Sequence, residues 1–179
     1  MSPFGAPLLA EPQIASQMGA APLPAPPAPA RVLVLGYGNP GRQDDGLGPA
    51  AAARIEAHGW PHVTAYDNYQ LNIEDAVDVA EHDVVWFVDA ARTGSAPFTI
   101  QELTPTPTLE FTSHLVRPEA ILAMAEQYYA ATPRAFLLGI RGYAFEFIEA
   151  LTPAASDNLD CAVAMLESEL FTGQGLVAP

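Results

Sequence analysis

From residue 31 onward, short apolar runs alternate with longer segments in which apolar residues recur every three or four positions. The short runs have the length of buried strands, and the longer segments have the period of a helix packed on one face. The predicted strands are 31–36, 63–67, 84–89 and 135–140, and the predicted helices are 48–58, 72–81, 117–131 and 157–171. This alternation predicts a three-layer α/β sandwich, with a mostly parallel central sheet of about five strands and helices on both faces.

A fifth strand is expected near residues 97–102, "PFTIQE", where polar and apolar residues alternate as in an edge or antiparallel strand. The stretch after it, "LTPTPTLEF", contains prolines that exclude a central strand, so we expect a loop there. Residues 1–30 are rich in alanine and proline and predict a flexible extension without the pattern of a secretory signal. We therefore expect one domain over 31–172, followed by a tail at 173–179.

The charge of the chain excludes several kinds of partner. Its 179 residues include 21 acidic and 7 basic ones, a formal net charge of −14 that would repel nucleic acid and anionic membranes. Every basic residue is arginine, which excludes lysine Schiff-base chemistry and a Walker loop. No apolar run has the length of a membrane span. The single cysteine, Cys161, is expected in the core of the last helix, and its isolation is typical of a cytoplasmic protein.

The stretch "VLGYGNPGRQDDGLG" follows the first predicted strand and carries Gly36, Gly38 and Gly41 at the spacing of a dinucleotide-binding loop. In such a protein Asp67, at the end of the second strand, would bind the ribose. However, the loop continues past Gly41 and ends in two acids. At 4 Å, each unit charge would repel a phosphate charge by about 4 kcal/mol at an effective dielectric near 20. A small dinucleotide-binding protein therefore remains the alternative function.

Three side chains can converge at the carboxyl edge of the predicted sheet. One of Asp44 and Asp45 can cap a helix, and the glycines around them allow the other, Asp45, to point into a crevice. Asp89 ends the third strand, "VVWFVDA", and His114 lies in a loop that can cross the sheet edge. Two carboxylates and one imidazole suit nickel or zinc better than calcium. We expect the other three histidines to be solvated.

The segments "VLGYGNPGRQDDGLG", "FVDA", "TSHLVRPEAIL" and "LLGIRG", in this order, resemble the maturation endopeptidases of nickel-iron hydrogenases. The resemblance extends from residue 31 to about residue 171. It implies an enzyme that removes the C-terminal extension of the hydrogenase large-subunit precursor after nickel has been loaded. It also implies that Asp45, Asp89 and His114 engage nickel supplied within that substrate, so that no tightly held metal of the protein's own is expected.

Two segments depart from the common pattern of that family. Many members carry Asp-Gly-Gly after the second strand where this chain has "YDNYQL", and Glu-Pro or Gln-Pro after the last strand where it has "RGY". Both departures resemble members that serve soluble, NAD-coupled hydrogenases. The predicted substrate-binding residues are Gly38, Asn39, Gln70 and Arg141.

The sequence leaves the chemistry of peptide hydrolysis open. The attacking water can be activated by nickel, which lowers the pKa of bound water. It can instead be activated by an aspartate acting as general base, and Asp45 and Asp67 are the candidates. A noncatalytic nickel chaperone with the same ligands is a third possibility.

Overall fold

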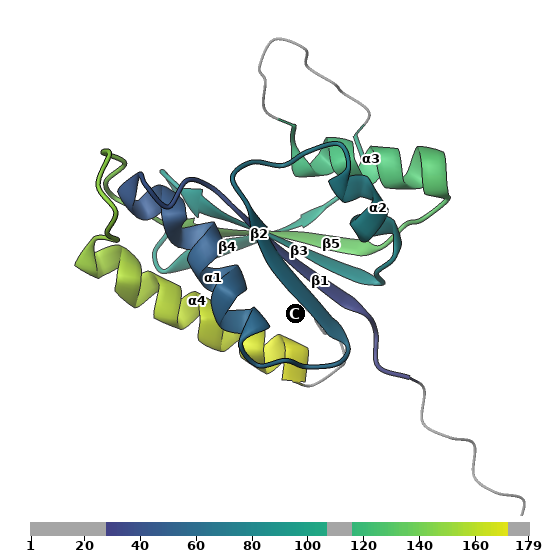
Figure 1. The fold of residues 1–179 in the computed structure, drawn as a ribbon, viewed down its shortest axis with the longest axis horizontal. Coiled ribbons are helices and arrows are strands. Elements are labelled where there is room, and N and C mark those ends of the chain that lie inside the picture. The colour runs from purple at the N-terminus through teal and green to yellow at the C-terminus, as the bar shows by residue number, and fades with distance from the viewer. Residues whose placement is uncertain (1–27, 107–115, 172–179) are drawn as a thin grey trace, which may run out of the picture.

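The computed structural model describes residues 28–106 and 116–171, which form a sheet with helices on both faces (Figure 1). The five strands lie in the order β2-β1-β3-β5-β4. All neighbours pair in parallel except β4, which runs antiparallel to β5 at the sheet edge. The strands are β1 (Val32–Tyr37), β2 (Val63–Asn68), β3 (Val84–Ala91), β4 (Phe98–Leu103) and β5 (Arg134–Arg141). The predicted fold class and the predicted edge strand are confirmed.

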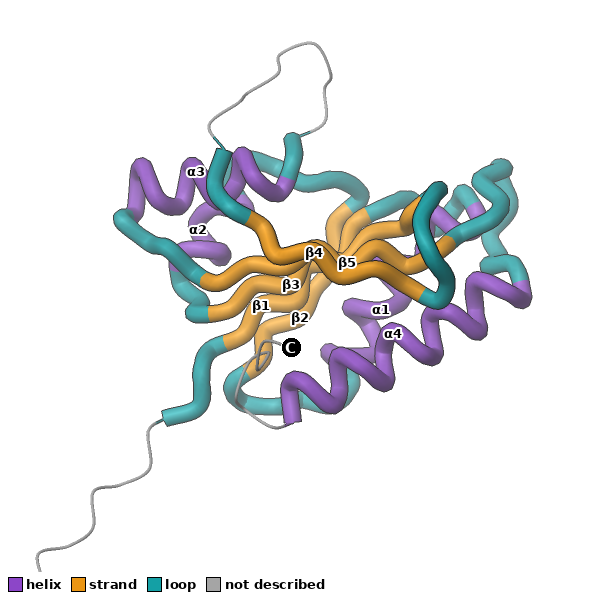
Figure 2. The backbone as a smooth tube through the Cα atoms, turned by 180° about the vertical axis from the view of Figure 1, so that it is seen from behind, coloured by secondary structure: helices purple, strands orange, loops and turns teal. Residues whose placement is uncertain are grey.

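The helices divide between the two faces of the sheet (Figure 2). They are the short 3-10 helix η1 (Gln43–Gly46), α1 (Leu47–Glu56), α2 (Asp75–Ala80), α3 (Pro118–Tyr129) and α4 (Pro153–Phe171). Residues of α1 and α4 share one buried cluster, and residues of α2 and α3 share the other. Helix α4 begins four residues earlier than predicted, because the Thr152 hydroxyl accepts a hydrogen bond from the Ala155 N–H (3.3 Å) as an N-cap does.

The central strands are buried on both faces, which explains their unbroken apolar sequences. In β1, Val32 and Val34 pack towards α1 and α4, whereas Leu33 and Leu35 pack towards α2 and α3. Strand β3 divides its side chains in the same way. Two separate hydrophobic layers therefore hold the five strands in a fixed register.

The prediction for Cys161 is wrong, because this side chain is exposed. The buried side of α4 carries Leu159, Ala162, Val163 and Leu166, which recur at helical spacing against the sheet. Cys161 falls on the opposite side of the same helix. Its neighbours in the sequence, Asp160 and Ala162, do not indicate this orientation.

Some expectations concern residues outside the described part of the chain. These residues include nearly all of the predicted extension 1–30, most of the predicted loop 103–111, and the tail 173–179. Within residues 28–106 and 116–171, none of the helices combines the length and the hydropathy needed to cross a bilayer.

Two glycines set the distance between α1 and the sheet. A Cβ atom on Gly36 would overlap the Gly48 carbonyl, and one on Gly48 would overlap the carbonyls of Tyr37 and Val88. The start of α1 therefore packs directly on the ends of β1 and β3. This contact places η1, which precedes α1, at the carboxyl edge of the sheet.

Candidate functional site

A cavity of about 470 Å³ opens at the carboxyl ends of β1 and β3. The chain leaves β1 towards β2 on one side, while β3 lies on the other, so this is the point where the strand order reverses. Ligands of open α/β sheets bind at such points. The cavity is lined by the loops after β1 and β2, the end of β3 and the start of α3: Tyr37, Gly38, Asn39, Arg42, Asp45, Tyr69, Gln70, Leu71, Asp89, Val116, Arg117 and Pro118.

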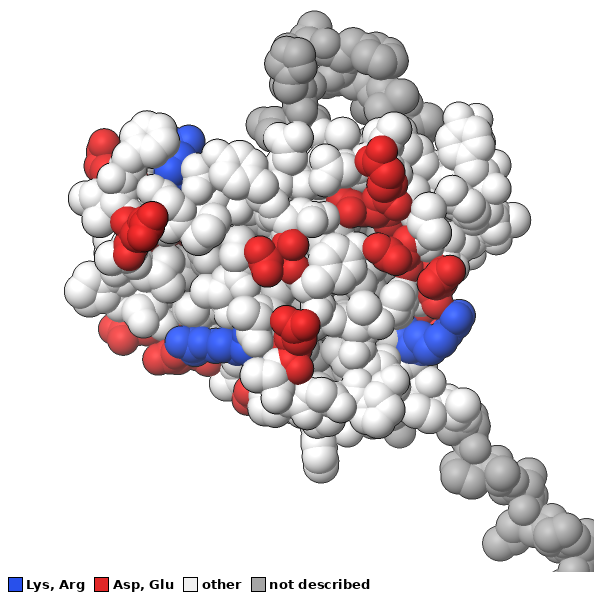
Figure 3. Space-filling model, viewed as in Figure 1, with Lys and Arg blue, Asp and Glu red and all other residues white. Residues whose placement is uncertain are grey.

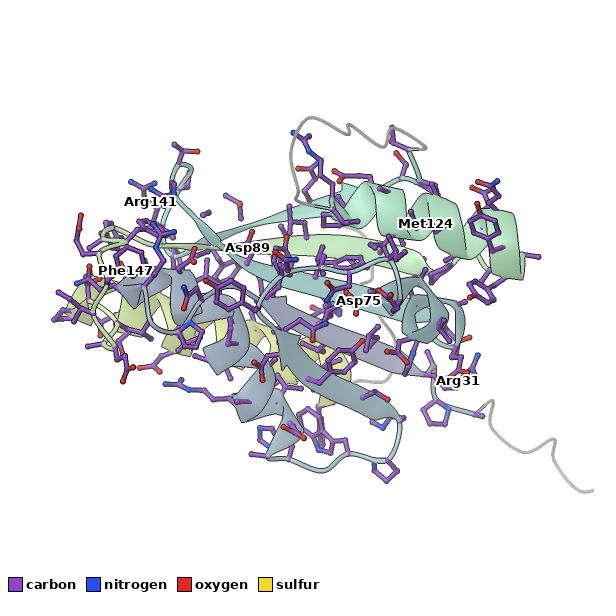
Figure 4. The ribbon with its side chains drawn as sticks, turned by 45° about the horizontal axis from the view of Figure 1, so that its top comes forward. Arg31, Asp75, Asp89, Met124, Arg141 and Phe147 are labelled. Atoms are coloured by element: carbon purple, nitrogen blue, oxygen red, sulfur yellow. The ribbon has the colours of Figure 1, made fainter. Side chains whose placement is uncertain are left out.

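Two of the three predicted metal ligands, Asp45 and Asp89, lie in this one cavity. Asp45 is partly buried in η1, and its Oδ2 accepts a hydrogen bond from the Asn39 N–H (3.2 Å). Asp89 ends the buried part of β3, near the middle of the molecule in Figure 4, and its Oδ1 accepts the Ala90 N–H (2.7 Å). The structure thus brings together two carboxylates that are 44 residues apart in the sequence.

The environment of Asp89 favours its neutral form. Burial raises the pKa of Asp89 to about 6, although the hydrogen bonds from Ala90 and the Tyr37 hydroxyl act in the opposite direction, and the charge of Asp45 adds to the increase. The Tyr37 pKa is also well above its usual value, because the ring is buried beside Asp89. Partly buried carboxylates that share a cavity, together with a raised pKa such as that of Asp89, are typical of catalytic and metal-binding sites.

The raised pKa of Asp89 predicts a pH-dependent cost of folding. In the unfolded chain Asp89 ionises near pH 4, whereas in the folded protein it ionises near pH 6. Stability is therefore lost as the pH rises through this interval, by about 3 kcal/mol at most. We expect Asp89→Asn to match the wild-type free energy of unfolding at pH 4 and to exceed it at pH 7. Urea denaturation at both pH values measures this, and equal stabilities at pH 7 would contradict it.

Asp44, next to the cavity residue Asp45, is fully buried and points away into a loop. Its carboxylate accepts hydrogen bonds from the N–H groups of Tyr143, Ala144 and Thr152 and from the Thr152 hydroxyl, at 2.7 to 3.0 Å. Burial is the largest influence and opposes ionisation, but these bonds outweigh it and hold the pKa of Asp44 below its ordinary value. Neither aspartate caps η1 or α1, so the capping prediction is wrong.

The structure separates the remaining predicted residues. Gly38, Asn39 and Gln70 line the cavity, whereas Asp67 and Arg141 do not. Asp67 is exposed, and strand alternation places it on the same sheet face as Ala65, which packs towards α1 and α4. The Arg141 guanidinium donates to the Arg92 carbonyl and lies over the ring of Tyr143, with 5.3 Å between guanidinium carbon and ring centroid.

His114 lies outside the described residues, so the three-residue metal site remains a prediction. Among residues 28–106 and 116–171, no group of three His, Cys, Asp or Glu side chains is arranged to hold a metal ion. The other histidines are not simply solvated. His58 pairs with Glu167, His62 contacts the Leu170 carbonyl, and His82 bonds the Asp78 carbonyl and Thr64.

Seven of the cavity residues were not predicted from the sequence, and four of these have polar side chains. Tyr37 and Arg42 lie inside the glycine-rich motif, whose interpretation was based on its glycines and acids alone. Arg117 precedes α3, and Tyr69, after β2, accepts a hydrogen bond from the Asn39 amide (2.6 Å). On the face shown in Figure 3, acidic side chains are scattered among few basic ones. The cavity is lined by two of the chain's 7 basic residues, Arg42 and Arg117.

The fold occurs in several solved structures. The hydrogenase maturating endopeptidase HybD from E. coli is 23% identical with a TM-score of 0.63, and the match covers 80% of this chain and 94% of that one. The [NiFe] hydrogenase maturation protease HycI from Thermococcus kodakarensis is 19% identical with a TM-score of 0.63, over 78% and 91%. A hydrogenase 2 maturation peptidase from a Thaumarchaeota archaeon is 23% identical with a TM-score of 0.58, over 79% and 98%.

These matches define the architecture of the chain. It has the fold of the hydrogenase maturation endopeptidases, as the motifs in its sequence predicted. Neither the family models nor the curated proteins gave a match.

Proposed function

We propose that this protein is an endopeptidase that removes the C-terminal extension of the large-subunit precursor of a nickel-iron hydrogenase. The observation that carries the proposal is the presence of Asp45 and Asp89 in one cavity at the carboxyl edge of the sheet. Solved structures with the same fold are named as hydrogenase maturation proteases. The sequence motifs around both acids point to the same activity.

In the proposed reaction, the scissile peptide lies in the cavity beside the two carboxylates. Water adds to the carbonyl carbon of the amide, the C–N bond breaks, and a proton passes from the water to the departing amine. The products are a shortened large subunit and the free extension. Asp45 lies in the cavity, where it can accept a proton from water, whereas Asp67 is exposed outside it. Of the two predicted general bases, the geometry therefore favours Asp45.

Nickel enters this proposal as part of the substrate. The oxygens of Asp45 and Asp89, together with a nitrogen of His114, form a donor set that suits nickel. Binding the metal through the protease would restrict cleavage to precursors that already carry it. We further propose a precursor of the soluble, NAD-coupled type, on the basis of the "YDNYQL" and "RGY" segments.

The proposal is tested by incubating the purified chain with a nickel-loaded precursor and with the same precursor lacking nickel. We expect release of the C-terminal peptide, detected by mass spectrometry, from the nickel-loaded form alone. Cleavage of both forms would remove nickel as a recognition element but leave the peptidase. If neither form is cleaved, the proposed peptidase activity is overturned.

His114→Ala provides a second test of the metal site. Because this change removes one of three nickel ligands, we expect processing to be abolished, with little change in the thermal unfolding midpoint. His58→Ala is the matched control, since His58 pairs with Glu167 away from the cavity. Full processing by His114→Ala would remove the three-ligand hypothesis.

The two alternative functions predict different experimental results. A nickel chaperone would bind the metal but release no peptide. A dinucleotide-binding protein would bind NAD in a titration. Two of the motif glycines are accounted for without a bound phosphate, because a Cβ on Gly36 would overlap the Gly48 carbonyl and one on Gly38 would overlap the Asp45 carbonyl.

A further inference from the structure

The loop between β5 and α4, residues 142–152, is fastened to the segment that carries the acid pair. The side chain of Asp44 accepts four hydrogen bonds from it. Backbone bonds add to these, from the Gln43 N–H to the Ile148 carbonyl (2.8 Å) and from the Asp44 N–H to the Ala144 carbonyl (3.1 Å). The Gln43 side chain accepts the Glu146 N–H at 3.0 Å. This β5–α4 loop is therefore held along most of its length.

The same attachment keeps the backbone in an unfavourable conformation. Gln43 has a φ of 47°, in the left-handed region that side-chain-bearing residues seldom adopt. Its N–H and its side chain both bond the β5–α4 loop. Such conformations persist where the surrounding structure determines them strongly, and they are concentrated at functional sites.

The tip of the β5–α4 loop presents apolar side chains to solvent. Phe147 is 83% exposed and Ile148 is 51% exposed. Both lie between Glu146 and Glu149, which are exposed as well. Figure 4 shows Phe147 at the end of the molecule where α4 begins. A large aromatic side chain on a firmly held loop is typical of a protein interface, because binding costs it little conformational entropy.

Arg42 joins this exposed tip to the cavity. It lines the cavity, and its guanidinium donates to the Phe145 carbonyl (3.3 Å). The guanidinium carbon also lies 5.1 Å from the centroid of the Phe147 ring. The cavity and the loop tip are therefore separated by a single side chain. A protein whose C-terminal segment enters the cavity would bring its folded body against this rim.

We propose that the tip of the β5–α4 loop, residues 146–149, is a docking surface for the body of the hydrogenase precursor. This inference rests on the proposed function. It commits to a partner surface with an apolar pocket for Phe147 and Ile148, flanked by basic residues that face Glu146 and Glu149. The docking surface adds affinity for the folded precursor, while Asp45 and Asp89 act on its C-terminal segment.

The test is the double change Phe147→Ser with Ile148→Ser, compared with Tyr128→Ser. Tyr128 is 68% exposed on α3, away from the cavity, and controls for the loss of any exposed aromatic ring. Cleavage kinetics are measured with the nickel-loaded precursor, and binding is measured separately by calorimetry. We expect the double variant to raise KM and Kd at least tenfold with kcat unchanged, and Tyr128→Ser to change neither.

The outcomes separate this inference from the proposed function. Unchanged KM and Kd in the double variant overturn the docking surface, even if the wild-type chain cleaves normally. A wild-type chain that binds the precursor through these residues without cleaving it overturns the peptidase alone, and one that does not bind it overturns the docking surface. A change in oligomeric state on sedimentation, with precursor affinity unchanged, assigns the tip to a second copy of the chain and also overturns the proposal.

Discussion

Asp45→Asn is expected to reduce processing of the nickel-loaded precursor by roughly 10² to 10⁴-fold, the usual contribution of a positioned acid or base. The amide keeps the size of the side chain and can still accept the Asn39 N–H, so the fold of η1 is retained. What it loses is the negative charge that accepts a proton or binds a cation in the cavity. The measurement is the rate of peptide release at saturating precursor, with the unfolding midpoint recorded in parallel.

Asp67→Asn is the matched comparison for this prediction. Asp67 was an equal candidate for general base in the sequence, but it is exposed and does not line the cavity. We expect this variant to process the precursor at close to the wild-type rate. A large loss with Asp67→Asn and a normal rate with Asp45→Asn would show that the cavity is not where the peptide is cleaved.

Asp44→Ala is expected to lower the free energy of unfolding by about 2 to 4 kcal/mol. The change leaves the part-buried N–H groups of Tyr143 and Thr152 without their acceptor, and it removes four of the hydrogen bonds that hold the β5–α4 loop to η1. Because Asp45 follows directly in η1, processing should decline as well. Urea denaturation at pH 7 measures the loss. Glu149→Ala, an exposed acid in the same loop, is the control and should change stability little.

The pH dependence gives this second prediction a further check. The folded pKa of Asp44 is lowered, so its contribution is present above the unfolded pKa near 4 and is lost as the pH falls through the folded value. The stability difference between wild type and Asp44→Ala should therefore shrink in acid. Asp89 behaves in the opposite way, since ionisation of Asp89 reduces stability. Two aspartates at one end of the sheet thus have opposite effects on folding.

Much of this site was predictable because it follows from the order of strands. The acids of "GRQDDGLG" and "VVWFVDA" each follow an apolar run, and parallel strands end at a common edge. That argument places Asp45 and Asp89 together without any knowledge of side-chain contacts. It fails for Asp67, because an edge strand such as β2 alternates its side chains between two faces, and the predicted strand end did not specify the face.

The different roles of the adjacent acids could not be read from their order in the chain. Asp44 and Asp45 are neighbours with the same chemistry, and either was a candidate for the cap. The Asp44 carboxylate accepts hydrogen bonds from residues about 100 positions away in the sequence. A local sequence pattern does not predict partners at such a distance. The exposure of Cys161 was missed for a related reason, since an apolar helical segment does not show which side meets the sheet.

The sequence by itself determined the layers, the edge at which the chemistry lies and the acids at that edge, because burial of apolar strands and helices follows from local periodicity. Only the tertiary structure decided which of two adjacent carboxylates enters the cavity and which anchors the β5–α4 loop. It alone also placed Arg42 between Asp45 and Phe147. These choices depend on hydrogen bonds and contacts between distant segments, which come into existence only when the chain is folded.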